Sequence, residues 1–311
     1  MLAIVNVILP VFAVVGLGYL AVRFRLYPAS GVPGLVAFVN NFATPFLLFR
    51  AMLTADFASA FNPAIIGPFY AGALFSLLAG SLVARRFFGN RPGESVSSGF
   101  SATFSNTVLI GIPVVHRAYG DAAMPVIYSI IGLHSPALIT LGMLVMELAR
   151  RDGGKASTAL LQAIPRVSRN PLLIGIVCGV IGNFAGLRLP EPADAFTLMM
   201  SQAVLPVALF GLGGALNQYR LAENWPLAGA MSTLKLLVHP TIAWVLMVPI
   251  LRVDPQIARF GVLLAAMPSG INTYVFATYY DRAVNVATNT ILISTLASVL
   301  TLSLWLFLLA G

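Results

Sequence analysis

The sequence predicts an all-α polytopic membrane protein of ten transmembrane helices, arranged as two inverted five-helix repeats with broken, crossing helices 4 and 9. Three observations lead to this fold class: the composition, the spacing of apolar runs, and landmark residues that recur in both halves. Of the 311 residues, 59% are hydrophobic and only 9% are charged, whereas a soluble domain carries about 25% charged residues. The composition is therefore that of a protein that crosses the lipid bilayer several times.

The apolar runs predict the number of spans. About 20 apolar residues are needed to cross a bilayer, and the sequence holds ten such runs, at 1–22, 33–52, 62–86, 96–116, 122–148, 168–187, 195–216, 226–250, 257–280 and 285–310. No basic residue precedes the first run, and Arg23 and Arg25 follow it. A cleaved signal peptide has the opposite order, so we expect the first run to be a retained span.

The basic residues predict the direction of the spans. The loops after odd-numbered spans hold twelve Lys and Arg residues, whereas the loops after even-numbered spans hold five. By the positive-inside rule the first set faces the cytoplasm, which places both termini outside. Cytoplasmic loops thus explain the formal net charge of +8. No basic patch with interleaved aromatic residues suggests a nucleic-acid partner.

Landmark residues recur at a nearly fixed interval in the two halves. At an interval of 161 residues, Pro10 matches Pro171, Gly18 matches Gly179, Pro45 matches Pro206, and the pair Asn40 and Asn41 matches Ser201 and Gln202. Farther along, Pro113 of span 4 matches Pro268 of span 9 at an interval of 155 residues. We therefore predict a first five-helix repeat at 1–148, a cytoplasmic linker at 149–167 and a second repeat at 168–311. Because five is odd, the second repeat is inverted, a design typical of secondary transporters.

Spans 4 and 9 carry residues that interrupt a helix. These are Asn106, Thr107, Gly111 and Pro113 in span 4, and Pro268, Ser269, Gly270 and Asn272 in span 9. Unwound backbone at membrane depth is tolerated only where protein or water satisfies its polar groups, so we expect the two broken helices to cross at the centre. The N-termini of the outgoing half-helices would favour an anion there, with Pro113 and Pro268 in their first turns.

Four sequence elements together resemble the auxin efflux carrier family. They are the N-x-x-x-x-G-x-P pattern formed by Asn106, Gly111 and Pro113, the stretch NNFATPFLLF in span 2, KLLVHP in span 8 and PSGIN in span 9. The resemblance covers essentially the whole chain. It implies crossed broken helices 4 and 9, a scaffold half and a transport half that move as an elevator, and a possible homodimer formed through the scaffold. Bacterial members of that family include malonate and related organic-acid carriers, which implies a place in the bacterial inner membrane.

Several polar residues are candidates for the binding site, each with a structural alternative. Asn106 and Asn272 lie nearest the two breaks, where they would contact a carboxylate or cap the half-helix ends. Thr107 and Ser269 are weaker candidates because a hydroxyl in a membrane helix often bonds to its own backbone. Gly111 and Gly270 would contribute backbone N–H groups. Asn41 and Gln202 precede the matched prolines of spans 2 and 7, and would bind substrate or join helices.

Lys235 is the least expected residue of the sequence. It lies about ten residues into span 8, and His239 follows one turn later on the same face. An ammonium group at the bilayer centre costs roughly 2.5–3.5 kcal/mol on insertion scales, so it should face the interior with a partner. It would compensate the C-terminal ends of the broken helices, neutralise an anionic substrate, or extend its amino group toward the interface.

The acidic residues and Cys178 limit the classes of function that the sequence allows. All ten acidic residues fall in loops or at span ends. Because no carboxylate is then expected at the centre of a span, proton coupling or uniport is favoured over sodium coupling. No nucleophile–base pair or carboxylate pair suggests an enzyme, and a single cysteine cannot build a cysteine metal site. We expect a carrier of a small organic anion such as malonate, without cofactor or metal. The alternatives are a carrier of a bulkier aromatic or sterol acid, or an anion channel.

Overall fold

The structure is a computed structural model that describes residues 2–54, 62–150, 169, 171–217 and 224–310. All regular secondary structure in these ranges is helical, apart from one isolated bridge between two residues. The expected cytoplasmic linker at 149–167 lies outside the described residues except for its first two positions.

The helices of the described residues follow one another along the chain. The first half contains α1 (Leu2–Arg23), η1 (Ala29–Gly31), α2 (Val32–Phe38), η2 (Val39–Ala43), α3 (Thr44–Leu53), α5 (Pro63–Phe88), α6 (Pro92–Ser101), η3 (Thr107–Gly111), α7 (Ile112–Tyr119), η4 (Gly120–Ala123) and α8 (Met124–Arg150). The second half contains α10 (Pro171–Phe184), α11 (Glu191–Gln202), α12 (Val204–Leu216), α13 (Trp225–Thr233), η5 (Leu234–Val238), α14 (His239–Val245), η6 (Leu246–Ile250), α15 (Pro255–Ala265), α16 (Asn272–Tyr280) and α17 (Val284–Leu308).

Six helical stretches of the described chain are long and apolar enough to cross a membrane. They are Ala29–Leu53, Pro63–Phe88, Thr107–Met146, Glu191–Leu216, Trp225–Ile250 and Val284–Leu308. Two shorter apolar helices, Leu9–Arg23 and Ile174–Phe184, accompany them. Large apolar side chains such as Leu82, Leu300 and Phe307 are exposed on the outside. Since lipid rather than water suits such a surface, the protein is an integral membrane protein.

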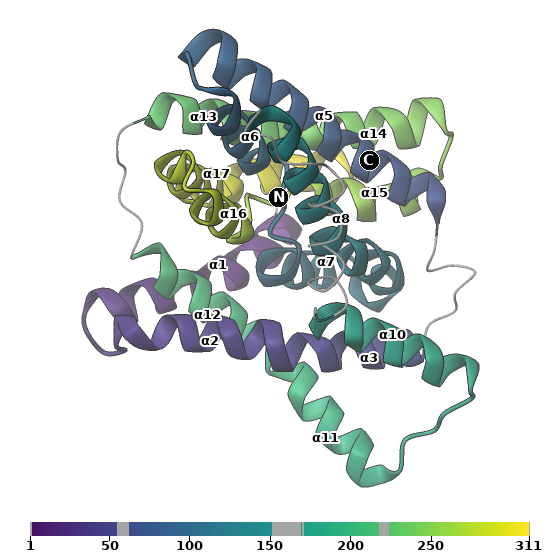
Figure 1. The fold of residues 1–311 in the computed structure, drawn as a ribbon. Coiled ribbons are helices and arrows are strands. Elements are labelled where there is room, and N and C mark those ends of the chain that lie inside the picture. The colour runs from purple at the N-terminus through teal and green to yellow at the C-terminus, as the bar shows by residue number, and fades with distance from the viewer. Residues whose placement is uncertain (1, 55–61, 151–168, 170, 218–223, 311) are drawn as a thin grey trace.

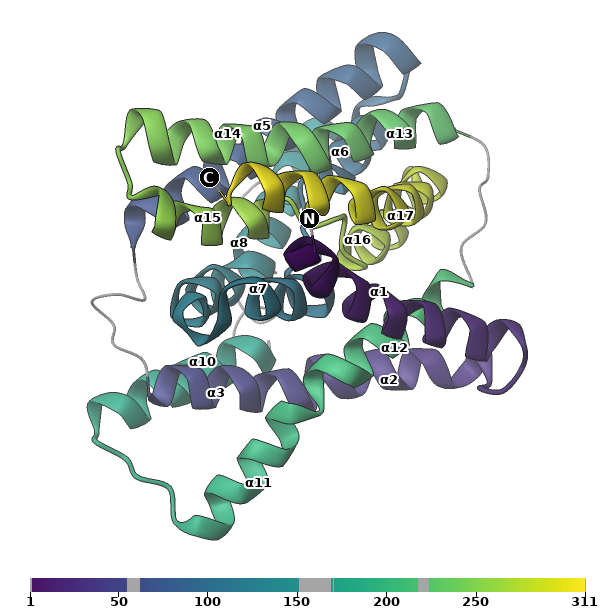
Figure 2. The same ribbon diagram turned by 180° about the vertical axis from the view of Figure 1, so that it is seen from behind.

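The helices form two groups that each draw on both halves of the sequence. One group, here the α3 group, contains α2, α3, α10, α11 and α12. The other, here the α5 group, contains α5, α6 and α13 to α17. Both views show α1, α7 and α8 between the two groups (Figures 1 and 2).

Two glycines allow the closest helix pairs to form. A Cβ atom at Gly18 would overlap the carbonyl oxygen of Phe210, and one at Gly179 would overlap that of Phe49. These contacts pack α1 against α12 and α10 against α3. The two contacts are equivalent at the interval of 161 residues, because Gly18 matches Gly179 and Phe49 matches Phe210.

Each π-helical segment lies beside a proline. The segments η2, η3 and η5 are followed by α-helices whose second residues are Pro45, Pro113 and Pro240, and η6 contains Pro249. Proline cannot donate to the carbonyl one turn back, and a π-helical turn is one way for a helix to skip that bond. The π-helical segments η2, η3 and η5 carry Asn41, Thr107 and Lys235, so three of the sequence candidates lie where the helical ladder is already irregular.

The two broken helices do not correspond to each other at the interval that the sequence predicted. One break lies at 102–106, between α6 and η3, and the other at 266–271, between α15 and α16. Pro268 lies inside its break, whereas Pro113 lies seven residues beyond the end of its own, so these two prolines are not counterparts. Ser101 and Ala265 end the two incoming half-helices, which differ by 164 residues. The expected interval of 155 is therefore wrong, because matching one proline to another ignored where the backbone leaves the helix.

Candidate functional site

The two breaks cross each other and satisfy one another's backbone. The N–H of Asn106 donates to the carbonyl of Pro268 at 2.7 Å, and the N–H of Gly270 donates to the carbonyl of Phe104 at 2.9 Å. These reciprocal bonds form the isolated antiparallel bridge at the crossing. Buried backbone outside a helix needs such partners in a membrane. Each broken helix therefore supplies a hydrogen-bond donor and an acceptor to the backbone of the other.

The last carbonyl of each incoming half-helix accepts a hydrogen bond from a side chain. Ser269 Oγ donates to the carbonyl of Ser101 at 2.6 Å, and Lys235 Nζ donates to the carbonyl of Ala265 at 2.7 Å. A cation is favourable at a helix C-terminus because the aligned peptide dipoles leave negative charge there. Of the three alternatives for Lys235, this geometry agrees with compensation of a helix end, and its fully buried side chain rules out extension toward the interface.

His239 holds the Lys235 amino group in place. His239 Nε2 lies 3.0 Å from the carbonyl oxygen of Phe69, which only accepts, so Nε2 carries the hydrogen in this bond. In the neutral ring Nδ1 is then an acceptor, and it receives a hydrogen bond from Lys235 Nζ at 3.2 Å. Gly72 lies against the ring, because a Cβ atom there would come within 2.8 Å of His239 Cδ2. Lys235 and His239 thus support the crossing from η5 and α14.

A further histidine contacts the crossing from α8. The N–H of Ser105 donates to His134 Nε2 at 3.1 Å, and the His134 ring packs edge-on against Phe104 and Phe69. His134 therefore helps to hold the first break in its extended conformation.

Hydrogen bonding determines the orientation of the Asn106 amide. Its Oδ1 accepts from the N–H of Leu109 at 3.2 Å and so caps the outgoing half-helix. This leaves Nδ2, a donor, on the opposite side of the amide. Nδ2 is buried and has no hydrogen-bond partner among the described residues. A buried donor without a partner is costly, so the group that completes this site must be an acceptor.

Backbone donors lie beside this amide. The N–H groups of Val108, Ile271 and Asn272 make no hydrogen bond with another described residue. They belong to the first turns of the two outgoing half-helices, where N–H groups lack an intrahelical acceptor and the helix dipole is positive. Together with Asn106 Nδ2 they form a cluster of donors that an anion would satisfy.

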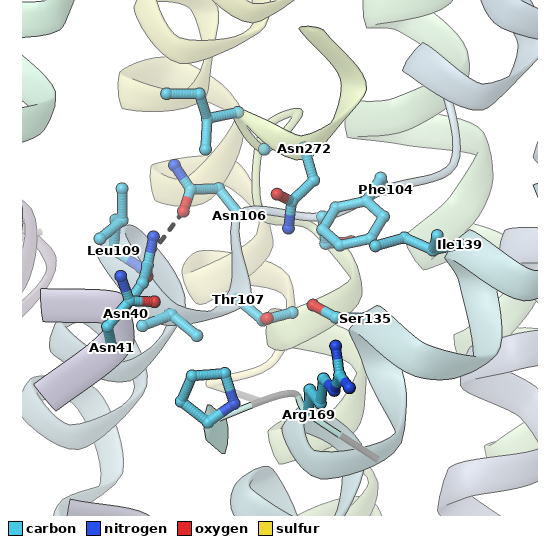
Figure 3. A pocket seen from close by; sticks show the side chains of 15 residues that line it. Asn40, Asn41, Phe104, Asn106, Thr107, Leu109, Ser135, Ile139, Arg169 and Asn272 are labelled. Atoms are coloured by element: carbon cyan, nitrogen blue, oxygen red, sulfur yellow. Dashed lines mark hydrogen bonds between the residues drawn. The ribbon is translucent and has the colours of Figure 1, made fainter. Parts of the chain in front are cut away.

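The residues that carry these donors line a pocket of about 380 Å³, here called the crossover pocket (Figure 3). Its lining comes from η2, the two breaks with their outgoing half-helices, α8 and the start of α10. The residues are Asn40, Asn41, Phe104, Ser105, Asn106, Thr107, Val108, Leu109, Ser135, Ile139, Arg169, Pro171, Gly270, Ile271 and Asn272. The pocket thus lies where the α3 group meets the crossing, and none of these residues is acidic.

The crossover pocket collects part of the sequence-predicted site. It brings together Asn41, Asn106, Thr107, Gly270 and Asn272, which come from three separate segments. The predicted residues that do not line it are Gly111, Pro113, Gln202, Lys235, His239, Pro268 and Ser269.

The residues outside the pocket have identifiable places. Gly111 packs against α15, since a Cβ atom there would come within 2.8 Å of Leu264 Cδ1. Gln202, the last residue of α11, is exposed away from the pocket. Ser269 and Lys235 bond to the half-helix ends, as described above. These positions assign Gly111 to packing, and Ser269 and Lys235 to the crossing itself, rather than to the pocket surface.

Ser135, Ile139 and Arg169 are among the lining residues that were not singled out as candidates from the sequence. Ser135 and Ile139 lie one turn apart on α8, and nothing in an apolar span distinguishes one serine from those that bond to their own backbone. Arg169 was assigned to a cytoplasmic loop because it lies at the edge of an apolar run. The proximity of the start of α10 to the crossing was needed to place it here.

Comparisons with known proteins agree with a membrane carrier. A family profile described as "Membrane transport protein" matches residues 3–306. The chain is 27% identical over 317 residues to a Rhizobium meliloti (strain 1021) protein named "Putative malonate transporter", covering 99% of this chain and 96% of that one. It is 23% identical over 330 residues to auxin efflux carrier component 8 of Arabidopsis thaliana, covering 89% of each. It is 24% identical over 326 residues to the lysosomal cholesterol signaling protein of Mus musculus, covering 96% of this chain and 37% of that one.

Proposed function

The chain belongs to the membrane transport protein family, whose members are transporters and not enzymes, and from this premise we propose that it is a secondary carrier of a small organic anion. A carboxylate such as malonate is the proposed substrate. The name of the Rhizobium meliloti relative supports this choice, and the crossover pocket supports it independently through its chemistry.

The observation that carries the proposal is the cluster of free donors at the crossing. Asn106 Nδ2 has no partner, and the backbone N–H groups around it point to an acceptor of negative charge. A carboxylate offers two oxygens with about four acceptor positions. The described lining residues include no acidic side chain, which supports an anion over a cation.

The proposed transport mechanism is an elevator. The crossover pocket lies between η2 of the α3 group and the crossing of the two broken helices. Movement of the crossing relative to the α3 group would carry the bound anion from one side of the membrane to the other. An inverted repeat with five spans in each half, 1–148 and 168–311, would make the two end states mirror images. The equivalent contacts Gly18 to Phe210 and Gly179 to Phe49 support that repeat.

The proposed setting is the bacterial inner membrane, with both termini outside and the more basic loops in the cytoplasm. A homodimer formed through the α3 group would leave the crossing free to move. Chemical cross-linking of the protein in membranes tests the dimer, and labelling of terminal tags from outside tests the orientation.

A bulkier acid is the second candidate substrate, and one observation favours it. An apolar cavity of about 600 Å³ lies on the other side of Ile271, which lines both this cavity and the crossover pocket. Displacement of the Ile271 side chain would join the two spaces and admit an aromatic or sterol body behind the carboxylate. The names of the Arabidopsis thaliana and Mus musculus relatives agree with such ligands.

Uptake by reconstituted protein tests the proposal. Liposomes containing the purified protein are given labelled malonate, with and without an imposed pH or sodium gradient, and are compared with empty liposomes. We expect saturable uptake that unlabelled malonate inside the liposomes accelerates, because counterflow is a property of carriers. Unitary currents without saturation would instead indicate an anion channel. If an aromatic acid is transported and malonate is not, the bulkier substrate replaces malonate.

A further inference from the structure

Arg169 is the charged side chain of the crossover pocket. The other lining residues, as far as the structure describes the chain, carry amides, hydroxyls or apolar groups and have no ionisable side chain. Arg169 is exposed and makes no hydrogen bond or ion pair with another described residue. A guanidinium group with five donors therefore lines the pocket without an acceptor among the described residues.

The packing of α10 on α3 shows how deep Arg169 lies. Gly175 contacts the backbone of Pro45, and Gly179 contacts the backbone of Phe49. Both contacts join residues 130 positions apart, so α10 and α3 run parallel in one register. Arg169 lies two residues before the start of α10 and lines the crossover pocket together with Asn40 and Asn41 of η2. These two asparagines lie near the middle of the span Ala29–Leu53.

A cation near the middle of a membrane span indicates a specific role for the side chain. Arginine at the centre of a membrane span is costly, and such residues usually face a cavity and take part in a substrate or ion pathway. Its position in one pocket with η2 distinguishes Arg169 from arginines at helix ends, which the positive-inside rule explains. The structure gives Arg169 a cavity to face, and the donors of the crossing lie on another wall of that cavity (Figure 3).

We propose that Arg169 binds the second carboxylate of a dicarboxylate whose first carboxylate is held by Asn106 and the half-helix N-termini. This inference rests on the proposed function as an anion carrier and adds the residue that selects for two charges. A planar guanidinium binds a carboxylate through two parallel hydrogen bonds, which an amide in the same place does not reproduce. Selection for dicarboxylates over monocarboxylates thus follows from one side chain.

Calorimetric titration of purified protein with malonate and with its monoamide tests the inference. The monoamide has the same size and one carboxylate, so it isolates the second charge. We expect wild type to bind malonate about 10- to 100-fold more tightly than the monoamide, the range of a hydrogen bond to a charged group. In Arg169→Gln the two ligands should bind alike, with the affinity for the monoamide unchanged. Arg188→Gln is the matched control, because Arg188 is exposed beyond the other end of α10 and does not line the pocket.

The outcomes separate the inference from the proposed function. Arg169→Gln protein that still prefers malonate, or that loses both ligands equally, overturns the role of Arg169 and leaves the carrier proposal intact. Wild type that binds neither ligand overturns malonate as the proposed substrate, and the inference about Arg169 with it. Arg169→Lys covers the case in which the glutamine variant does not fold, because it keeps the charge and loses the planar fork. Its preference for malonate should fall about 3- to 10-fold, and an unchanged preference contradicts the inference.

Discussion

At the scale of single residues, the oxygen and the nitrogen of the Asn106 side-chain amide have different roles. Oδ1 caps the outgoing half-helix through Leu109, while Nδ2 is buried without a partner among the described residues. The sequence left capping and substrate contact as alternatives for this residue. The structure makes them compatible, because the capping bond itself determines which atom remains for a ligand.

Substitution of Asn106 by aspartate separates these roles. Asn106→Asp keeps an oxygen for the N–H of Leu109, and a carboxylate is favourable at a helix N-terminus. It replaces the free donor with a negative charge. We therefore expect a thermal unfolding temperature near that of wild type and at least a tenfold loss of malonate affinity, measured by titration.

Asn62→Asp is the control for this change. Asn62 caps α5 in the same way, through the N–H of Ala64 at 3.0 Å, and lies outside the pocket. Malonate affinity should be unchanged in this variant. Full malonate binding by Asn106→Asp would show that Nδ2 is not a ligand donor.

At the scale of helices, the crossing depends on the ends of its incoming half-helices. Ser269→Ala leaves the carbonyl of Ser101 without its donor, and Lys235→Met does the same to Ala265. An unsatisfied buried acceptor costs about 1–3 kcal/mol. Lys235→Met also leaves Nδ1 of His239 without its donor. It removes a buried ammonium group as well, which offsets part of the cost, so we expect a loss of stability similar to that of Ser269→Ala.

Thermal unfolding in detergent measures both effects. Ser303→Ala is the control, because this serine bonds to its own helix at an exposed position of α17 and its loss should change stability by less than about 0.5 kcal/mol. Ser269→Ala protein as stable as Ser303→Ala protein would mean that another group satisfies the carbonyl of Ser101.

The packing of α5 on α14 is a second property of the helices that a single substitution tests. Gly72→Ala would bring a Cβ atom within 2.8 Å of His239 Cδ2 and 3.0 Å of its carbonyl oxygen. The ring must then move away from Phe69, and overpacking of this kind costs about 1–3 kcal/mol. Gly67→Ala in the same helix has no atom within 4 Å of the new Cβ. Because alanine is the better helix former, this control should be as stable as wild type or more so, and equal unfolding temperatures for the two variants would contradict the packing argument.

The approximate positions of the breaks were predictable, whereas their bounds and partners were not. Prolines, glycines and amides at 105–113 and 268–272 indicated an interruption in each helix, because those residue types act on their own backbone. The first break nevertheless ends at Asn106, and the residues after it are helical. The pairing of Asn106 with Pro268 is a tertiary contact, and matching Pro113 to Pro268 gave a wrong interval. Arg169 shows the same limit, since hydropathy detects the edge of an apolar run and carries no information on how far α10 slides along α3.

At the scale of the whole molecule, each group of helices takes parts from both halves of the chain. Composition and apolar spacing were sufficient to predict an all-helical membrane protein. The interleaving arises from glycine contacts between halves, which bring α1 against α12 and α10 against α3. Such small residues let membrane helices approach closely. The inverted repeat that we propose requires these two contacts to be equivalent.

Equal sensitivity of Gly18 and Gly179 is the prediction that follows from that equivalence. A side chain at either position would overlap a backbone carbonyl, of Phe210 or of Phe49, and no rotamer relieves a clash that begins at Cβ. We expect Gly18→Val and Gly179→Val each to lose about 3 kcal/mol or more, seen as a similar drop in unfolding temperature. Gly16→Val, with no atom near the added Cβ, should remain stable. If only one of the two substitutions were tolerated, the two interfaces would not be equivalent, and the symmetry argument for alternating access would lose its support.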